Sequence, residues 1–334
     1  MGAASAARWP AVEREEWVGW WHGFLPGQAG WLDEGAPAVT DPYADAAGLV
    51  ARSAAAYAAS VPTDPADDGF FGPASVTWQV SADLSAIVAG LRALLVQALH
   101  PLAMAGVDQH SDWRRDPVGR LAATSSYLAA VRFGDRAVAE RAAARVRKIH
   151  EHVRGVDRVT GRPYAASDPA LLLWIHAVLV ESTLIACELF GTAPATADGD
   201  RYVAEMAVAA ELVGVPAALV PSDAAGLQRY LSSVRPELRC TPAAAEAAAY
   251  LLDPPGLDED IGEIWQDIRD GAIAALPDWA REMYGYRAAD GLTPARRTEI
   301  RQALGVLDAV FLGEPGVLEA RQRIALRMRA VQRA

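Results

Sequence analysis

Cysteine is scarce in this sequence. The 334 residues include two cysteines, Cys187 and Cys240, which lie 53 positions apart and form neither a CxxC pair nor a longer metal-binding pattern. This spacing argues against a cysteine-based metal site. We expect two reduced, buried thiols, a state that fits the cytoplasm.

Positive charge is also in deficit. Lys and Arg number 31 against 42 Asp and Glu, and the net charge is −11. Because nucleic-acid binding needs a basic field, this balance argues against a nucleic-acid partner.

The N-terminus has no basic region followed by an apolar stretch, so no export signal is expected. The most apolar run, 169–190, contains His176, Glu181 and Glu188, which favours a buried helix over a stable membrane span.

Strand signals are scarce too. The closest approach to a hairpin dipeptide, Asp68-Gly69, is followed by Phe70-Phe71-Gly72-Pro73, and this stretch is predicted to be a loop. Alanine supplies much of the 52% hydrophobic content, and alanine is the best helix former. The sequence therefore predicts an all-α fold.

The expected helices follow apolar periodicity and Asp-Pro or Thr-Pro openings. They lie within 1–25 and near 45–59, 75–99, 117–133, 135–150, 169–190, 198–213, 223–233, 241–252, 260–285 and 293–312, and a basic tail helix reaches about 329. Gly155 is expected to be the glycine that ends the 135–150 helix. One multi-helix domain over 1–334 is predicted, with an irregular N-terminal lead over 1–70, a core over 75–290 and C-terminal helices over 291–334.

Motifs of the common enzyme classes are missing. The sequence has no nucleophile elbow, P-loop, glycine fingerprint or paired-carboxylate motif. Four of the six histidines lie in or at the ends of apolar helices: His100, His150, His152 and His176. His150 and His152 are two positions apart and project about 200° from one another on a helix, so they cannot form a HExxH-type zinc pair. A single histidine on an apolar face is more often a core residue than a ligand, and both interpretations stay open here.

Two helices carry polar stripes. Arg120, Thr124 and Tyr127 fall at i, i+4 and i+7 on the 117–133 helix and could present a guanidinium, a hydroxyl and a phenol to a cavity. The alternative is an arginine–carboxylate contact beside a capped turn.

A second stripe follows on the next helix. Arg147, His150 and Arg154 are expected to share a face there, which would suit a ligand with anionic arms, such as the propionates of haem. The alternative is a solvated basic face with a histidine at a helix C-terminus.

Several ordered segments of the chain carry a resemblance to a known family. They are Leu91–Pro101 (LRALLVQALHP), Asp116–Thr124 (DPVGRLAAT), Val146–His150 (VRKIH), Gly161–Pro169 (GRPYAASDP), Leu173–His176 (LWIH) and Leu276–Gly285 (LPDWAREMYG). The set resembles the oxygenases that include latex-clearing rubber oxygenases and the membrane-bound fungal oxygenase of mycophenolic acid biosynthesis. The likeness covers roughly residues 70–290.

The resemblance implies a haem b protein with a globin-like helical core around a buried pocket. By position in the motifs, His150 matches the proximal ligand of the haem iron, and Arg120 and Thr124 match residues beside the haem. His176 is implied as an alternative ligand or a pocket residue, and His100 as a further lining residue. Where rubber oxygenase has a lysine that can ligate the iron distally, this chain has Ala123.

The implied activity is oxidation or cleavage of a small apolar or isoprenoid substrate with dioxygen. Two alternatives stay open. One is a haem carrier or gas sensor without oxygenase activity, and the other is a helical binding protein without the cofactor. The sequence leaves the oligomeric state open, with a homodimer as one option.

Overall fold

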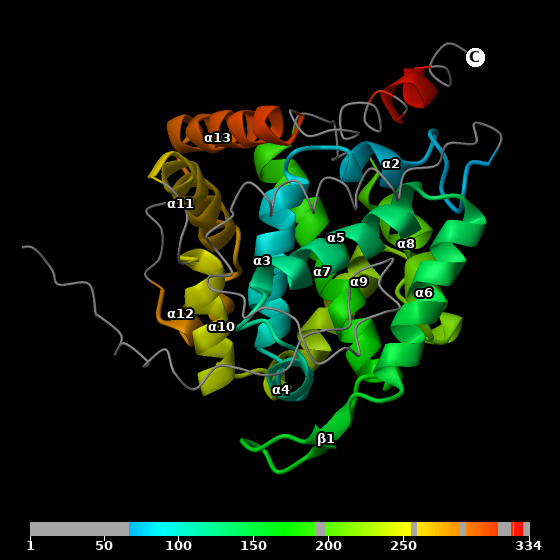
Figure 1. The fold of residues 1–334 in the computed structure, drawn as a ribbon, viewed down its shortest axis with the longest axis vertical. Coiled ribbons are helices and arrows are strands. Elements are labelled where there is room, and N and C mark those ends of the chain that lie inside the picture. Colours follow the sequence, from blue (N-terminus) through cyan, green and yellow to red (C-terminus); the bar gives the residue numbers. More distant parts are fainter. Residues whose placement is uncertain are drawn as a thin grey trace, which may run out of the picture.

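The computed structural model describes residues 67–191, 198–254, 259–286, 292–312, 322 and 324–329. The helices expected within 1–25 and near 45–59 lie outside these residues, as does nearly all of the N-terminal lead. In chain order the described helices are α2 (Val76–Ser81), α3 (Ala86–Ala98), α4 (Pro101–His110), α5 (Pro117–Phe133), α6 (Arg136–His150), α7 (Pro169–Phe190), α8 (Gly199–Val213), α9 (Ala224–Val234), α10 (Pro242–Leu252), α11 (Glu259–Ala274), α12 (Asp278–Tyr284) and α13 (Pro294–Leu312), with short 3₁₀ turns η3 (Ala217–Leu219) and η4 (Arg235–Glu237). The all-α fold class is confirmed (Figure 1).

Proline openings set the start of the principal helices. α5, α7 and α10 each begin with proline, whose missing N–H costs nothing in the first turn of a helix. The residue before each proline caps the free amides: the Asp116 carboxylate accepts from the Gly119 N–H at 2.7 Å, and Asp168 accepts from Ala170 at 2.9 Å. The predicted helices near 117–133, 169–190 and 241–252 are therefore confirmed.

Two expected helices are each split in the structure. The helix predicted over 75–99 is α2 followed by α3, because a turn intervenes in which the Asp83 carboxylate accepts from the Ser85 N–H at 2.9 Å. The helix predicted over 260–285 is α11 followed by α12, since Pro277 precedes the start of α12.

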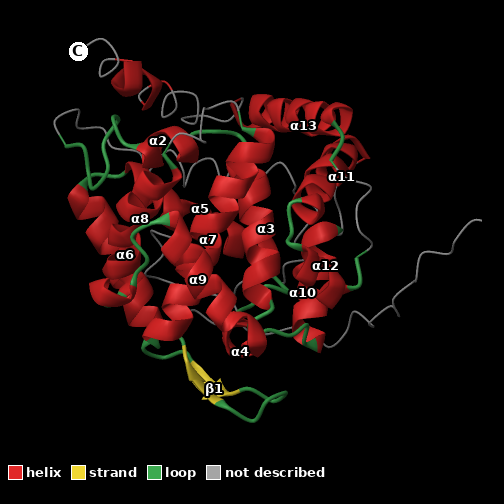
Figure 2. Ribbon diagram, turned by 180° about the vertical axis from the view of Figure 1, so that it is seen from behind, coloured by secondary structure: helices red, strands yellow, loops and turns green. Residues whose placement is uncertain are grey.

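A helix and a hairpin were missed by the sequence interpretation. His100-Pro101 ends α3 as expected, but Pro101 also opens α4, which was not predicted. Gly155 is not a helix terminator, because α6 ends at His150 and Gly155 belongs to β1. β1 (Arg154–Val156) pairs antiparallel with β2 (Pro163–Ala165), and this hairpin projects from the helical body (Figure 2).

The core is built around two neighbouring helices, α3 and α7, which run side by side through the middle of the molecule (Figure 1). Leu95 and Val88 of α3 and Trp174 and Val178 of α7 are almost fully buried there. α10, α11 and α13 cover one side of this pair, and α5 crosses in front of it. Burial of such large apolar side chains, about 1.5–3 kcal/mol each, is the main force holding the bundle together.

A buried arginine connects this core to three other elements. Arg92 of α3 is 1% exposed, and its Nη2 donates to the Glu181 carboxylate at 3.0 Å. Its Nη1 donates to Ser182 Oγ at 2.6 Å and its Nε to the Ala275 carbonyl at 2.8 Å. Gln228 of α9 donates to the other Glu181 oxygen at 3.1 Å. Every guanidinium nitrogen therefore has a partner, which offsets the cost of burying the charge.

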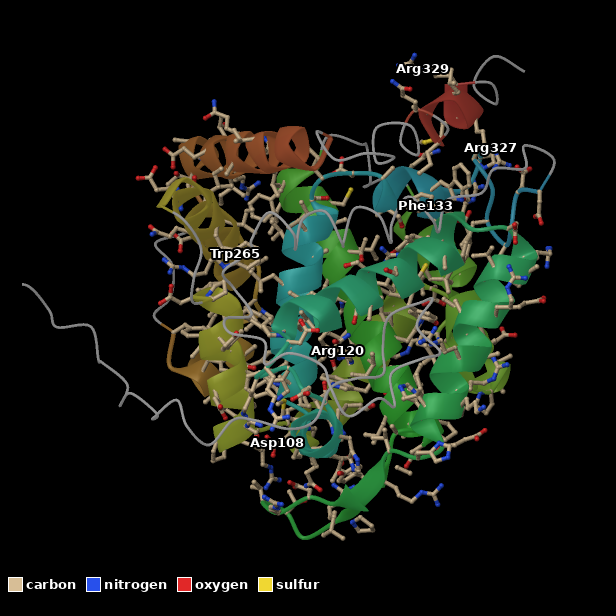
Figure 3. All side chains as sticks on the ribbon, viewed as in Figure 1. Asp108, Arg120, Phe133, Trp265, Arg327 and Arg329 are labelled. Atoms are coloured by element: carbon tan, nitrogen blue, oxygen red, sulfur yellow. The ribbon has the colours of Figure 1, made fainter. Side chains whose placement is uncertain are left out.

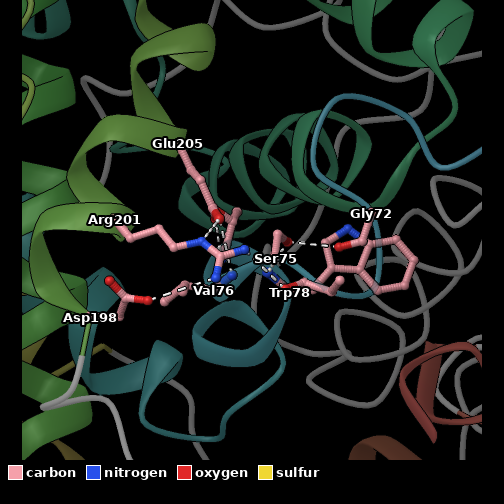
Figure 4. Close-up of polar contacts among 9 residues, drawn as sticks. Gly72, Ser75, Val76, Trp78, Asp198, Arg201 and Glu205 are labelled. Atoms are coloured by element: carbon pink, nitrogen blue, oxygen red, sulfur yellow. Dashed lines mark hydrogen bonds and ion pairs between the residues drawn. The ribbon is translucent and has the colours of Figure 1, made fainter. Parts of the chain in front are cut away.

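The N-terminus of α2 is held by a carboxylate from a distant helix (Figure 4). Glu205 of α8 accepts from the Thr77 N–H and the Thr77 hydroxyl, both at 2.8 Å, and Arg201 holds the same carboxylate at 2.9 Å. An anion at a helix N-terminus stabilises the free amides and the helix dipole. This contact fixes α2 against α8.

One described helix is long and apolar enough to cross a membrane by itself. It is α7, with 22 residues, and 67% of its most apolar stretch is buried inside the fold. α3 and α4 pass the same test as a pair that is bent by 102°. Core helices of soluble proteins have the same length and composition, so this is weak evidence for a span.

Gly69 is a position where a side chain has no room. Its φ is +66°, and a Cβ there would lie 2.2 Å from the Gly134 carbonyl oxygen at the end of α5. We expect Gly69→Ala to lower the free energy of unfolding by about 2–3 kcal/mol, measured by urea denaturation. Gly161, with φ +70° and no atom within 4 Å of its Cβ position, is the matched control: Gly161→Ala should cost about 1 kcal/mol. Equal losses in the two variants would contradict the steric argument.

Candidate functional site

The polar stripe on α5 is present in the structure. Arg120 and Thr124 contact each other: Arg120 Nη1 donates to Thr124 Oγ1 at 3.2 Å, and Thr124 Oγ1 donates to the Arg120 carbonyl at 3.0 Å. Burial lowers the pKa of the Arg120 guanidinium. Figure 3 shows Arg120 near the centre of the molecule.

His150 is the last residue of α6, which packs against α5. Its Nδ1 is buried and has no hydrogen-bond partner. Burial lowers the pKa of His150, and the positive charge of Arg120 lowers it further. The ring is therefore held neutral at neutral pH, with a buried nitrogen that no protein group uses.

The expected stripe of Arg147, His150 and Arg154 on one helix face is wrong. α6 ends at His150, so Arg154 lies on β1. The Arg154 guanidinium is exposed and donates to the Glu151 carbonyl. Arg147 donates to the Leu212 carbonyl at the end of α8, and its charge acts on the phenol of Tyr127. Arg147 is thus close to the α5 stripe, whereas Arg154 points to the hairpin surface.

A second group of polar residues lies between α5 and α7. His176 of α7 is 8% exposed, and its pKa is lowered to about 4 by burial and then by the charge of Arg132. Tyr127 has its pKa raised to about 12 by burial, against the opposing effects of Arg132 and Arg147. Arg132 is itself buried, in the last turn of α5.

Seven residues of α5, α6 and α7 together make up what we call the interior cluster: the buried or partly buried Arg120, Thr124, Tyr127, Arg132, His150 and His176, and the exposed Arg147, whose charge acts on Tyr127. The charges that act on its two histidines and its tyrosine are all those of arginines. The cluster therefore combines neutral rings with cations, an environment suited to a ligand with anionic groups.

His100 stands apart from this cluster. Its Nδ1 accepts from the Ala103 N–H at 3.4 Å, which caps α4, and its ring lies 5.8 Å from that of Trp174. Burial lowers its pKa, with smaller effects from Glu237 and Arg162. These contacts make His100 part of the corner between α3 and α4.

Two surface hollows are found beside the hairpin, and both include His110. One is lined by Asp108, Gln109, His110, Arg114, Arg154 and Arg158, and the other by His110, Arg145, Lys148, Ile149, His152 and Val153. Figure 3 shows Asp108 at this end of the molecule. Neither hollow is lined by a member of the interior cluster. The globin-like core and the buried pocket that the resemblance implies are not shown by the described residues.

The sequence interpretation missed Arg132. In the sequence it is an arginine near the end of a helix, where a cation is commonly exposed and favoured by the helix dipole. Its neighbours Val131 and Phe133 are apolar and buried, and this local pattern is the one signal that could have singled it out. Among the described residues, no group of three or more His, Cys, Asp and Glu side chains is placed to hold a metal ion.

The buried His176 makes the stability of the ligand-free protein depend on pH. An unfolded histidine has a pKa of 6.5 and the native one about 4, so the native state binds fewer protons between these values. Stability is complete above pH 6.5 and falls as the pH drops towards 4, by an amount on the order of 3 kcal/mol. We expect urea denaturation across this range to give a flatter profile for His176→Gln. A profile as steep as that of the native chain would contradict this assignment.

Comparison with known proteins identifies the family to which the sequence belongs. The model of the family described as "ER-bound oxygenase mpaB/B'/Rubber oxygenase, catalytic domain" matches residues 78–309. No curated protein and no solved structure matches this chain. The matched range contains α3 to α12 and all seven residues of the interior cluster. Because the match extends over more than half of the chain, this protein belongs to the family of rubber oxygenase and mpaB-type oxygenase catalytic domains, and it is an oxidoreductase of the oxygenase class.

Proposed function

We propose that this protein is a haem b-dependent oxygenase that uses dioxygen to oxidise or cleave an apolar substrate, and that His150 holds the haem iron. The observation that carries the proposal is the His150 ring, which ends α6 inside the cluster with a buried nitrogen that has no partner. A buried polar atom without a partner is costly, and a ligand that engages the ring would remove that cost.

The residues of the interior cluster fit a haem on chemical grounds. A neutral imidazole is the form that binds iron, and burial beside Arg120 favours that form of His150. Haem b also brings two propionates, and Arg147 and Arg120 offer guanidinium donors on the helices that flank the imidazole. When bound, a haem supplies the iron centre at which dioxygen is bound and activated.

In this proposal, the other residues of the cluster orient the substrate and donate hydrogen bonds to it. Arg120 holds Thr124 Oγ1, so the hydroxyl and the guanidinium are fixed relative to one another on one face of α5. Thr124 uses its one hydroxyl proton for the Arg120 carbonyl, so in this proposal the Arg120 guanidinium is the donor to the oxygen of a substrate carbonyl. Tyr127 remains a protonated phenol at neutral pH and is a further donor. Ala123, beside Thr124, carries no side-chain group that could ligate iron.

His176 and His100 have separate places in the proposal. His176 is neutral at physiological pH and would be the alternative residue to hold the iron, since it too is a buried imidazole near a cluster arginine. His100 caps α4 and its ring contacts that of Trp174 at a tilt of 45°, so we assign it to the structure of that corner.

The experiment that tests the proposed function is an absorption spectrum of the protein expressed with added haem precursor, as isolated and after dithionite. We expect a Soret band in both states, and dioxygen consumption when a linear isoprenoid alkene is added. The control is the matched saturated hydrocarbon, which should consume none. A preparation without Soret absorbance would refute haem dependence, and a Soret band without dioxygen uptake would favour a haem carrier or sensor.

A cytoplasmic location accompanies this proposal. Both cysteines are free thiols; Cys187 is buried and Cys240 is half-buried. Burial raises the pKa of both thiols, so neither is activated for oxidation. Alkylation of both thiols in unfolded protein taken directly from cells would support this location, and an intact disulfide would contradict it.

A further inference from the structure

Arg132 is a buried cation in which two guanidinium nitrogens have no hydrogen-bond partner. It is 8% exposed, and its Nε and Nη2 atoms are both inaccessible to solvent and make no hydrogen bond. Among the described ion pairs, none involves Arg132. Arg92 provides the comparison within the same protein, because it is buried to a similar degree and each of its guanidinium nitrogens has an acceptor.

An arginine in this state opposes folding. A buried charge without a counterion destabilises the folded state, and guanidinium donors without acceptors add to that cost. Arginine side chains stay charged at physiological pH, so deprotonation does not relieve this destabilisation. Asp135, three residues further along the chain, caps α6 by accepting from the Val138 N–H at 2.7 Å.

The neighbours of Arg132 link it to the interior cluster. Its charge acts on the ring of His176 and on the phenol of Tyr127, which lie on α7 and α5. Neither of these neighbours carries a negative charge at neutral pH. No described carboxylate pairs with Arg132, and a guanidinium whose Nε and Nη2 lack acceptors matches a carboxylate in the two-pronged geometry that arginine favours.

We propose that Arg132 binds the carboxylate of an apolar ligand that occupies the interior cluster. Two sources share this chemistry: a haem propionate, or the carboxylate of an acidic apolar substrate. The first source rests on the proposed function, whereas the second does not require haem. In either case Arg132 anchors the polar end of the ligand between α5 and α7 and leaves its apolar part among the core helices.

The first test measures the ligand-free full chain by thermal denaturation. Arg132→Met removes an unpaired buried charge and keeps the side-chain length, so we expect the Tm to rise. Arg92→Met removes a fully partnered arginine and should lower the Tm. Equal or lower stability of Arg132→Met relative to the native chain would overturn the claim that this guanidinium lacks a partner.

The second test distinguishes the two sources of the carboxylate. Haem b and its dimethyl ester differ in the propionate charges, and palmitate and hexadecanol differ in the carboxylate. If the ligand is the propionate, we expect the native chain to bind haem b at least tenfold more tightly than the ester, and Arg132→Met to lose this preference. If the carboxylate belongs to an acidic substrate, we expect the native chain to prefer palmitate over hexadecanol and Arg132→Met to lose this preference. Arg132→Lys keeps the charge and should retain part of either preference.

Two outcomes of these titrations separate the inference from the proposed function. A native chain that binds no haem but prefers palmitate through Arg132 would refute the haem proposal and support the anchor. If Arg132→Met keeps the native preferences in both pairs of ligands, the anchor is refuted while haem binding by His150 stands. Arg141→Met, which changes an exposed arginine on α6, is the control for a general loss of positive charge.

Discussion

Replacing His150 by alanine is expected to abolish the Soret band of protein expressed with haem precursor. The ring ends α6 beside Arg120 and is the histidine of the cluster with a buried, unpartnered nitrogen. Losing an axial imidazole removes the one proposed bond between protein and iron, so we expect haem affinity to fall by at least 100-fold. The measurement is a haem titration of the purified variant, followed at the Soret maximum.

His152→Ala is the matched control for this experiment. His152 is two residues further along the chain, is exposed, and has its Nδ1 within 2.9 Å of the Lys148 carbonyl. The variant should bind haem like the native chain. Added imidazole should restore part of the band in His150→Ala, because it can occupy the space that the side chain left. An unchanged Soret band in His150→Ala would transfer the ligand role to another histidine, with His176→Ala as the next variant to test.

Replacing Arg92 by alanine should cause the largest loss of stability among the substitutions considered. The change leaves the Glu181 carboxylate in the core without its cation and strips Ser182 Oγ and the Ala275 carbonyl of their donor. Removing one partner of a buried pair costs about 3–5 kcal/mol, because the remaining charge stays buried. Urea denaturation monitored by tryptophan fluorescence measures this loss.

The control for Arg92 is an ion pair of the same type at the surface. Arg162 and Glu237 are 2.8 Å apart, with side chains that are 53% and 46% exposed. Solvent screens such a pair, so Arg162→Ala should cost about 0–1 kcal/mol. Similar losses in the two variants would mean that burial does not set the strength of the Arg92 contact. The double variant Arg92→Met with Glu181→Leu should recover part of the lost stability, because it leaves no isolated charge.

Two buried arginines of this fold, Arg92 and Arg132, differ in their hydrogen-bond partners. Arg92 is satisfied by groups from α7 and by the carbonyl that follows α11, and it holds the bundle together. Arg132 receives no such support. Natural proteins retain groups that weaken the fold where those groups serve a function, and this contrast within one chain is the reason for assigning Arg132 to ligand binding.

Local sequence signals predicted the helices well. Asp116-Pro117, Asp168-Pro169 and Thr241-Pro242 mark helix starts to within a residue, because proline and the capping side chain before it act on amides in the same turn. The same signal at His100-Pro101 was interpreted as a break and not as a start, so α4 was missed. The hairpin was missed because each strand is three residues long, too short to show an alternating pattern.

Part of the candidate site was also visible in the sequence. The spacing of Arg120 and Thr124 places them on one helix face, and the structure joins them by hydrogen bonds. The spacing of Arg147, His150 and Arg154 predicted wrongly that all three share one helix face, because the prediction assumed that the helix continues past His150. Spacing places residues on a common face as long as both belong to the same helix.

By itself, therefore, the sequence determined the all-α class, the boundaries of most helices and the pairing of Arg120 with Thr124, since each depends on residues within a few turns of one another. The tertiary structure decided which polar groups are buried together and which of them have partners. Burial and missing partners are set by side chains from helices far apart in the chain: His176 on α7 meets the charge of Arg132 on α5, and Glu181 on α7 reaches Arg92 on α3. No local pattern carries that information, because the free energy of a buried charge depends on everything packed around it.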